Sequence, residues 1–107
     1  MSTKIITHDD CLEHVTPPGH PEQVARLEHV LTALAPLGLE TLTAPLAPDD
    51  DLLRCHPQSH INALRAAAPQ DGWSRLDADT HMSPGTLTAA LRAAGGALRA
   101  VDMVMSG

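Results

Sequence analysis

Four side chains near the amino terminus carry the nitrogen and sulfur atoms that zinc binds: His8, Cys11, His14 and His20. Imidazole nitrogen and thiolate sulfur are the usual ligands of structural zinc, which holds four of them in a tetrahedron. A site of this kind usually takes one pair of ligands from a compact knuckle and a second pair from elsewhere in the chain. One interpretation of the sequence is therefore a small protein that binds a metal through histidine and cysteine side chains.

The second pair of ligands would have to be His56 and His60. Their spacing of four residues places both on one face of a helix. No glutamate lies between them, as the His-Glu-x-x-His motif of metalloproteases requires. We favour the alternative in which the histidines lie in polar loops or bond to the backbone, and we expect no metal site in this chain.

Other catalytic chemistry finds little support in the sequence. Asp77 and Asp79 are spaced to cap a turn or to accept amide hydrogens from a ligand. Ser83, Thr80 and Cys55 have no base beside them that would make a nucleophile. The chain has no glycine-rich phosphate loop and no tyrosine. We therefore name no catalytic residue.

The first half of the chain alternates short strands with helices. Residues 4–7 are β-branched and predict a strand, residues 8–19 predict a loop, and residues 39–43 predict a second strand. Between them, Pro21 is placed to open a helix that ends before Pro36 and Gly38. This alternation is typical of the opening units of a parallel α/β sheet.

Short helices are predicted in the middle of the chain. Three aspartates at 49–51 favour a helix start, and Pro57 is placed to open a helix that carries Ile61 and Leu64. Residues 69–73 predict a loop. We see no internal repeat and no domain boundary, so residues 1–107 are read as a single partial domain.

The last third of the chain predicts a long apolar helix. Ser83 is a good N-cap and Pro84 suits the first helical position. Gly95 and Gly96 lie in mid-helix, where each costs about 1 kcal/mol relative to alanine, so we expect close packing against a neighbouring backbone as compensation. Apolar residues recur at steps of four and three: Leu87, Leu91, Ala94, Leu98, Val101 and Met105.

This helix runs almost to the last residue, and an apolar helix has to be covered. We expect the chain to be the front part of a larger α/β domain. Left uncovered, the stripe formed by Leu87, Leu91, Leu98, Val101 and Met105 would face water and favour a homo-oligomer through this helix. A non-catalytic, self-associating α/β or helical module is therefore a second reading.

Composition excludes several partners. The net charge is −6 and the seven basic residues are scattered, which argues against nucleic acid and against an anionic membrane. Trp73 is the only aromatic residue. Two cysteines make no disulfide framework, and no signal peptide or spanning segment is evident, so we expect a cytoplasmic protein with reduced thiols.

Three passages, taken in order, resemble the amino-terminal part of the histone deacetylase superfamily, especially bacterial deacetylases and proteins similar to acetoin-utilisation proteins or acetylpolyamine amidohydrolases. The first runs from Thr7 through the Gly-His-Pro-Glu of 19–22 to Arg26. The second is Cys-His-Pro-x-x-His-Ile at 55–61. The third is Leu-Asp-Ala-Asp-Thr-x-x-Ser-Pro-Gly at 76–85, continuing to residue 102. The chain departs from the family pattern at Gln23 and Val24, and at His60, where tyrosine is usual.

The resemblance implies an arginase/deacetylase-like parallel sheet flanked by helices, mostly helical in this portion with one or two short strands. Full-length members of the family use zinc to activate water that attacks an acetyl-lysine or an acetylated polyamine. The resemblance places Arg26 near the inner end of the substrate tunnel, and His20, Asp77 and Asp79 near its rim. The zinc ligands, the histidine pair and the tyrosine of the family have no counterpart here, so we expect this chain alone to be inactive.

Overall fold

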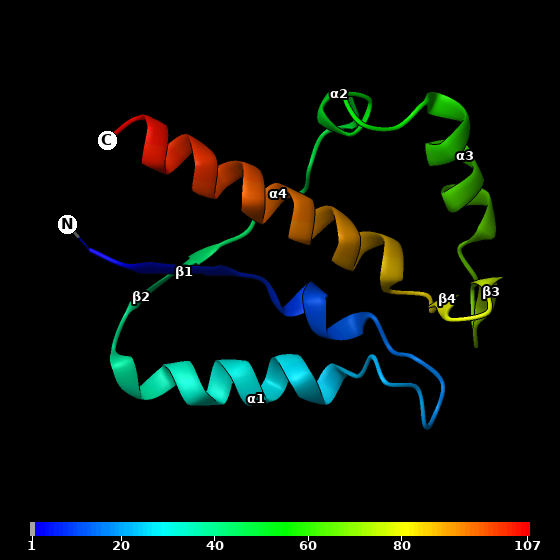
Figure 1. The fold of residues 1–107 in the computed structure, drawn as a ribbon, viewed down its shortest axis with the longest axis horizontal. Coiled ribbons are helices and arrows are strands. Elements are labelled where there is room, and N and C mark those ends of the chain that lie inside the picture. The colour runs from blue at the N-terminus through cyan, green and yellow to red at the C-terminus, as the bar shows by residue number, and fades with distance from the viewer. Residues whose placement is uncertain (1) are drawn as a thin grey trace.

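The computed structural model describes residues 2–107 and places a short parallel sheet between two long helices. Figure 1 shows α4 (Thr86–Met105) above the sheet and α1 (Val24–Leu34) below it. Strand β1 (Lys4–Thr7) pairs in parallel with β2 (Glu40–Thr43), with Lys4 opposite Glu40 and Thr7 opposite Thr43. The predicted α/β class and the predicted first strand are confirmed.

The crossover from β1 to β2 carries a 3-10 helix (Asp9–Glu13), then α1, then a second 3-10 helix (Ala35–Leu37). Gly38 follows with φ of 64°, a left-handed conformation that ends the helix as predicted. The predicted start at Pro21 was wrong, because α1 begins at Val24. The side chain of Gln23 donates to the carbonyl of His20 at 3.1 Å, and the extended backbone of Gln23 lies outside the helix.

Two short helices follow β2. Helix α2 (Asp49–Leu52) begins with the predicted run of aspartates, and α3 (Gln58–Ala67) begins immediately after Pro57. Arg65 of α3 donates to both carboxylate oxygens of Asp49, at 2.6 and 3.0 Å. This two-pronged bond fixes α3 relative to α2, and Ile61 of α3 is buried.

The structure contains a hairpin that the sequence did not predict. Strand β3 (Ser74–Asp77) pairs antiparallel with β4 (Thr80–Met82), and Ala78 and Asp79 form the turn between them. The register shifts between Arg75 and Asp77. The hairpin adds two strands to the pair that the sequence predicted.

Helix α4 begins at Thr86, three residues after the predicted N-cap. Ser83 does not cap the helix with its hydroxyl, because that group is used elsewhere: it accepts from the backbone N–H of Val15 and donates to the carbonyl of Glu13, both at 3.1 Å. Ser83 thereby joins the amino-terminal loop to the start of α4.

The predicted close approach at the glycines of α4 is confirmed. A Cβ added to Gly95 would lie 1.9 Å from the carbonyl oxygen of Pro45, and the N–H of Ala47 bonds to the carbonyl of Leu91 at 3.0 Å. The neighbour is thus the segment after β2 in the same chain.

The expected stripe on α4 divides into two parts. Leu87, Leu91 and Leu98 are half-buried against their own chain, so the prediction that they face water was wrong. Val101 and Met105 do face water, with exposed fractions of 60% and 80%. The hydrophobic core is small and formed mostly by small side chains: the buried apolar residues are Ala44, Ala47, Ile61, Met82 and Ala89.

Candidate functional site

The tip of the β3–β4 hairpin presents a pair of aspartates. The carboxylate of Asp77 accepts the backbone N–H of Asp79 at 2.9 Å, which closes the turn. This bond, with a further hydrogen bond from the Thr80 side chain, holds the pKa of Asp77 below its ordinary value. Asp77 is therefore a turn-forming carboxylate, whereas Asp79 is exposed at the tip.

His20 joins this tip to the amino-terminal loop. Its Nε2 lies 2.8 Å from the carbonyl oxygen of Asp79, and its Nδ1 accepts the backbone N–H of Glu22 at 3.1 Å. A carbonyl only accepts, so Nε2 must carry the hydrogen and Nδ1 must be free to accept. The two hydrogen bonds fix the tautomer and the orientation of the ring, and they hold the loop against the hairpin.

His81 completes the polar group at the hairpin. Its ring meets the ring of His20 edge to face, with 5.4 Å between centroids. Its Nδ1 is buried and has no hydrogen-bond partner among residues 2–107. A hollow of about 380 Å³ opens beside these rings and is lined by His20, His81 and Asp79 together with apolar side chains such as Leu76 and Leu87. Histidine rings, a carboxylate and apolar walls thus meet in one place.

Arg26 lies in a different hollow. It belongs to the first turn of α1 and is exposed, and it lines a groove of about 650 Å³ between α1, β1 and α4. Four residues line both this groove and the hairpin hollow and form the wall between the two: His14, Glu22, Thr86 and Ala90. The structure therefore brings His20, Asp77 and Asp79 together and sets Arg26 apart from them.

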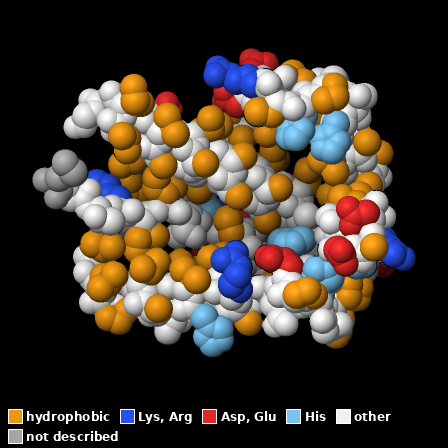
Figure 2. Space-filling model, viewed as in Figure 1, with side chains coloured by type: hydrophobic (Ala, Val, Ile, Leu, Met, Phe, Trp, Pro, Cys, Tyr) orange, Lys and Arg blue, Asp and Glu red, His pale blue; other side chains and the backbone are white. Residues whose placement is uncertain are grey.

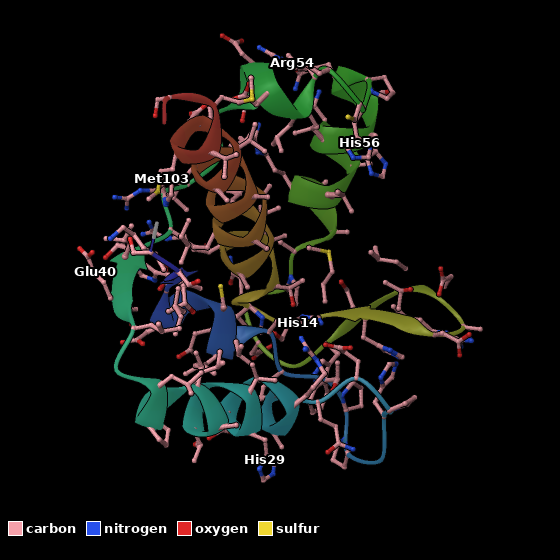
Figure 3. All side chains as sticks on the ribbon, turned by 60° about the vertical axis from the view of Figure 1, so that its left-hand side comes forward. His14, His29, Glu40, Arg54, His56 and Met103 are labelled. Atoms are coloured by element: carbon pink, nitrogen blue, oxygen red, sulfur yellow. The ribbon has the colours of Figure 1, made fainter. Side chains whose placement is uncertain are left out.

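The wall residues are part of a network that the sequence analysis missed. His14 Nδ1 lies 2.7 Å from the hydroxyl of Thr86, which also accepts the N–H of Ser83 at 2.7 Å. Figure 3 shows His14 inside the molecule between the amino-terminal segment and the start of α4, whereas His29 and His56 point outward. The pattern Ser83-Pro-Gly-Thr86 was visible in the sequence, but its partner at His14 is 72 residues away.

Arg92 of α4 makes a second set of long-range hydrogen bonds, to the segments that follow β1 and β2. Its Nε donates to the carboxylate of Asp10 and its terminal nitrogen donates to the carbonyl of Ala44, each at 2.9 Å. The segments that follow the carboxyl ends of β1 and β2 are thereby joined to α4.

The histidines and cysteines do not fit a zinc ion. His8 Nδ1 accepts the N–H of Asp10 at 2.9 Å, and His14 and His20 are engaged as described above. Cys11 and Cys55 are free thiols. His56 and His60 lie together, with ring centroids 4.8 Å apart, but no third ligand joins them. Within the described residues, no group of three or more His, Cys, Asp or Glu side chains is arranged to hold a metal ion.

Comparison with known proteins decides the family. The model of the histone deacetylase domain matches residues 20–107, which include the hairpin, Arg26 and the whole of α4. The chain belongs to the histone deacetylase family. The resemblance to the histone deacetylase superfamily that the sequence indicated is thus confirmed.

Several deacetylase relatives are similar over nearly the whole chain. A probable deacetylase of Archaeoglobus fulgidus is 32% identical over 99% of this chain, and a histone deacetylase-like amidohydrolase of Pseudomonas aeruginosa is 36% identical over 87% of it. The match covers 31% and 26% of these relatives, so the chain spans less than a third of their length.

The fold agrees with the family. The crystal structure of the HDA15 HD domain superposes with a TM-score of 0.75 over 90% of this chain and 30% of that one, at 23% identity. Among residues 2–107, no helix is long and apolar enough to cross a membrane.

Proposed function

We propose that this chain forms the amino-terminal part of a zinc-dependent deacetylase that acts in the cytoplasm on acetyl-lysine or acetylated polyamines. The observation that carries the proposal is the hairpin hollow, where Asp79, His20 and His81 meet within a segment that matches the deacetylase domain. Acetylated amines of this kind present an amide N–H and often neighbouring positive charge. Both are recognised by an exposed carboxylate such as that of Asp79.

Each proposed site residue has a distinct part in this function. Asp79 accepts hydrogen bonds from the substrate at the rim, Asp77 holds the turn that presents Asp79, and His20 fixes the turn to the loop. Arg26 lines the groove beside β1. There its guanidinium attracts the acetate product or the carbonyl oxygen of the acetyl group. None of these residues is proposed to carry out the hydrolysis itself.

Zinc and the proton-transferring groups are proposed to come from other residues of a full-length family member. His8, His14 and His20 use ring nitrogens in hydrogen bonds, and no three possible metal ligands converge among residues 2–107. We therefore propose that this chain alone has no cofactor and does not hydrolyse amides. A second candidate function, self-association without catalysis, is favoured by the large apolar groove beside β1.

A chimera tests the deacetylase proposal. The aligned segment of the Pseudomonas amidohydrolase is replaced by this chain, and deacetylation of an acetyl-lysine peptide is measured after zinc content has shown that the chimera is folded. We expect deacetylation above that of a chelated control. Substituting Asp79→Asn should raise KM by about tenfold or more, because a charge-assisted hydrogen bond contributes about 1.5–3 kcal/mol.

The matched control is Asp50→Asn, which removes an exposed carboxylate from α2. We expect KM to be unchanged by this substitution. A chimera that binds zinc and is well folded but inactive, or one in which the two aspartate variants behave alike, would contradict the proposed roles.

A further inference from the structure

The chain exposes far more surface than a compact protein of its size. Its accessible surface is 7308 Å², whereas a monomer of 11.3 kDa is expected to expose about 5,700 Å². Its radius of gyration is 15.3 Å, against about 13 Å expected for this length. About 1,600 Å² of surface is thus in excess, which is twice what one partner buries in an interface of standard size.

Much of the excess lies along one groove. The groove of about 650 Å³ runs beside β1, with Leu27 of α1 on one side and a row of alanines of α4 on the other. That row consists of Ala90, Ala93, Ala97 and Ala100. Figure 2 shows hydrophobic side chains on α4 and on α1, either side of the amino-terminal strand.

The edge of β1 is available for pairing in this groove. Within residues 2–107, β1 pairs with β2 alone, so its other edge has no strand beside it. An unpaired strand edge is a template for a further strand. A strand added at this edge would have a helix on each face, because α4 and α1 lie on opposite sides of the sheet (Figure 1).

The charges along the strand indicate the direction of the added strand. Lys4, which pairs with Glu40, stands at the amino end of β1, and the exposed Asp9 follows the carboxyl end, where Asp10 is already bonded to Arg92. A second β1 running antiparallel sets the basic end of each strand toward the acidic end of the other. A parallel copy would set like charges together.

We propose that the groove is filled by a second copy of this chain, with β1 paired antiparallel to β1 about a two-fold axis. An axis perpendicular to the sheet places α4 of each copy on the same side, where the alanine rows pack together. Small side chains allow the two helices to approach closely. If each copy buries its excess surface, the interface totals about 3,200 Å², within the range of obligate homodimers.

This surface differs from the stripe predicted from the sequence. The alanine row faces the groove, whereas Leu87, Leu91 and Leu98 are half-buried against their own chain. The proposal does not depend on the proposed deacetylase function, because it concerns the molecular mass of the isolated chain and not its activity.

Sedimentation equilibrium of the 107-residue chain tests the proposal. At about 50 µM, well above the Kd of a nanomolar to low-micromolar dimer, we expect a mass of twice 11.3 kDa. Substituting Ala97→Glu places two like charges in the interface and should raise the dimer Kd by about tenfold or more. Ala97 is exposed in the single chain, so the variant should fold, which its circular dichroism will check.

Two control variants locate the interface. Ala63→Glu changes an exposed alanine of α3, and Met105→Glu changes the exposed end of the stripe predicted from the sequence. We expect both to leave the dimer intact. A monomeric wild type would overturn the proposal and leave the groove to the remaining part of a deacetylase domain. A dimer that Met105→Glu disrupts and Ala97→Glu does not would overturn the location.

Discussion

Residue types with metal-binding capacity serve structure in this chain. His8, His14 and His20 each use a ring nitrogen in a hydrogen bond within the protein. The spacing of histidines along a sequence does not show whether their rings converge on a metal or turn toward backbone groups. Here the contact partners, Thr86 and Asp79, lie 72 and 59 residues from their histidines, beyond the reach of local pattern analysis.

The acidic turn gives a prediction about pH. The pKa of Asp77 is held below its ordinary value of 3.8, chiefly by the N–H of Asp79 and also by Thr80. The stabilisation is therefore complete above about pH 4 and is lost as the pH falls through the lowered pKa. We expect Asp77→Ala to reduce the free energy of unfolding at pH 7 and pH 5, with a smaller difference from wild type below pH 3.8.

Urea unfolding of both proteins from pH 7 to about pH 2.5 measures this difference. The variant Asp102→Ala, which removes an exposed carboxylate from α4, controls for the loss of charge alone. A difference between wild type and Asp77→Ala that stays constant down to the lowest pH would show that the carboxylate does not stabilise the turn in its ionised form.

At the scale of elements, the sequence predicted those with strong local signals. The β-branched run at Lys4–Thr7 and the Pro36 and Gly38 stop after α1 are local features, and both predictions were correct. The β3–β4 hairpin was missed because its strands have four and three residues and its turn contains neither glycine nor asparagine. Long-range bonds support it, including one from Trp73 Nε1 to the carbonyl of Val15 at 2.7 Å.

The packing of α4 gives a prediction about stability. In Gly95→Ala the new methyl group would lie 1.9 Å from the Pro45 oxygen, so helix and segment must separate. We expect a net loss of about 1–3 kcal/mol in the free energy of unfolding, despite the better helix propensity of alanine. Thermal or urea unfolding will measure it.

Gly96→Ala is the matched control. Its methyl group would lie 3.2 Å from the Ala44 Cβ, a contact that needs a shift of only a few tenths of an ångström, so we expect the gain in helix propensity to offset most of the strain. If the two variants were equally stable, the close approach at Gly95 would not be a constraint on α4.

At the scale of the whole molecule, the chain holds the hairpin hollow, the groove beside β1 and the wall between them on a small core. The chain spans less than a third of the length of the Archaeoglobus and Pseudomonas relatives, and its buried apolar residues are mostly small. The ties made by Ser83 and Arg92 hold the amino-terminal loop to α4 and keep the two hollows in place. The sequence could name the rim residues by resemblance, but the separate position of Arg26 depends on the packing of α1.

We propose that this chain supplies a part of a deacetylase and does not perform the hydrolysis by itself. The most direct test is acetate release from an acetyl-lysine peptide and from an acetylpolyamine by the purified chain, with and without added zinc. The chain has no tyrosine, and residues 2–107 contain no cluster able to hold a metal, so we predict no release above a sample without protein. Turnover that is abolished by a chelator and restored by zinc would contradict the account.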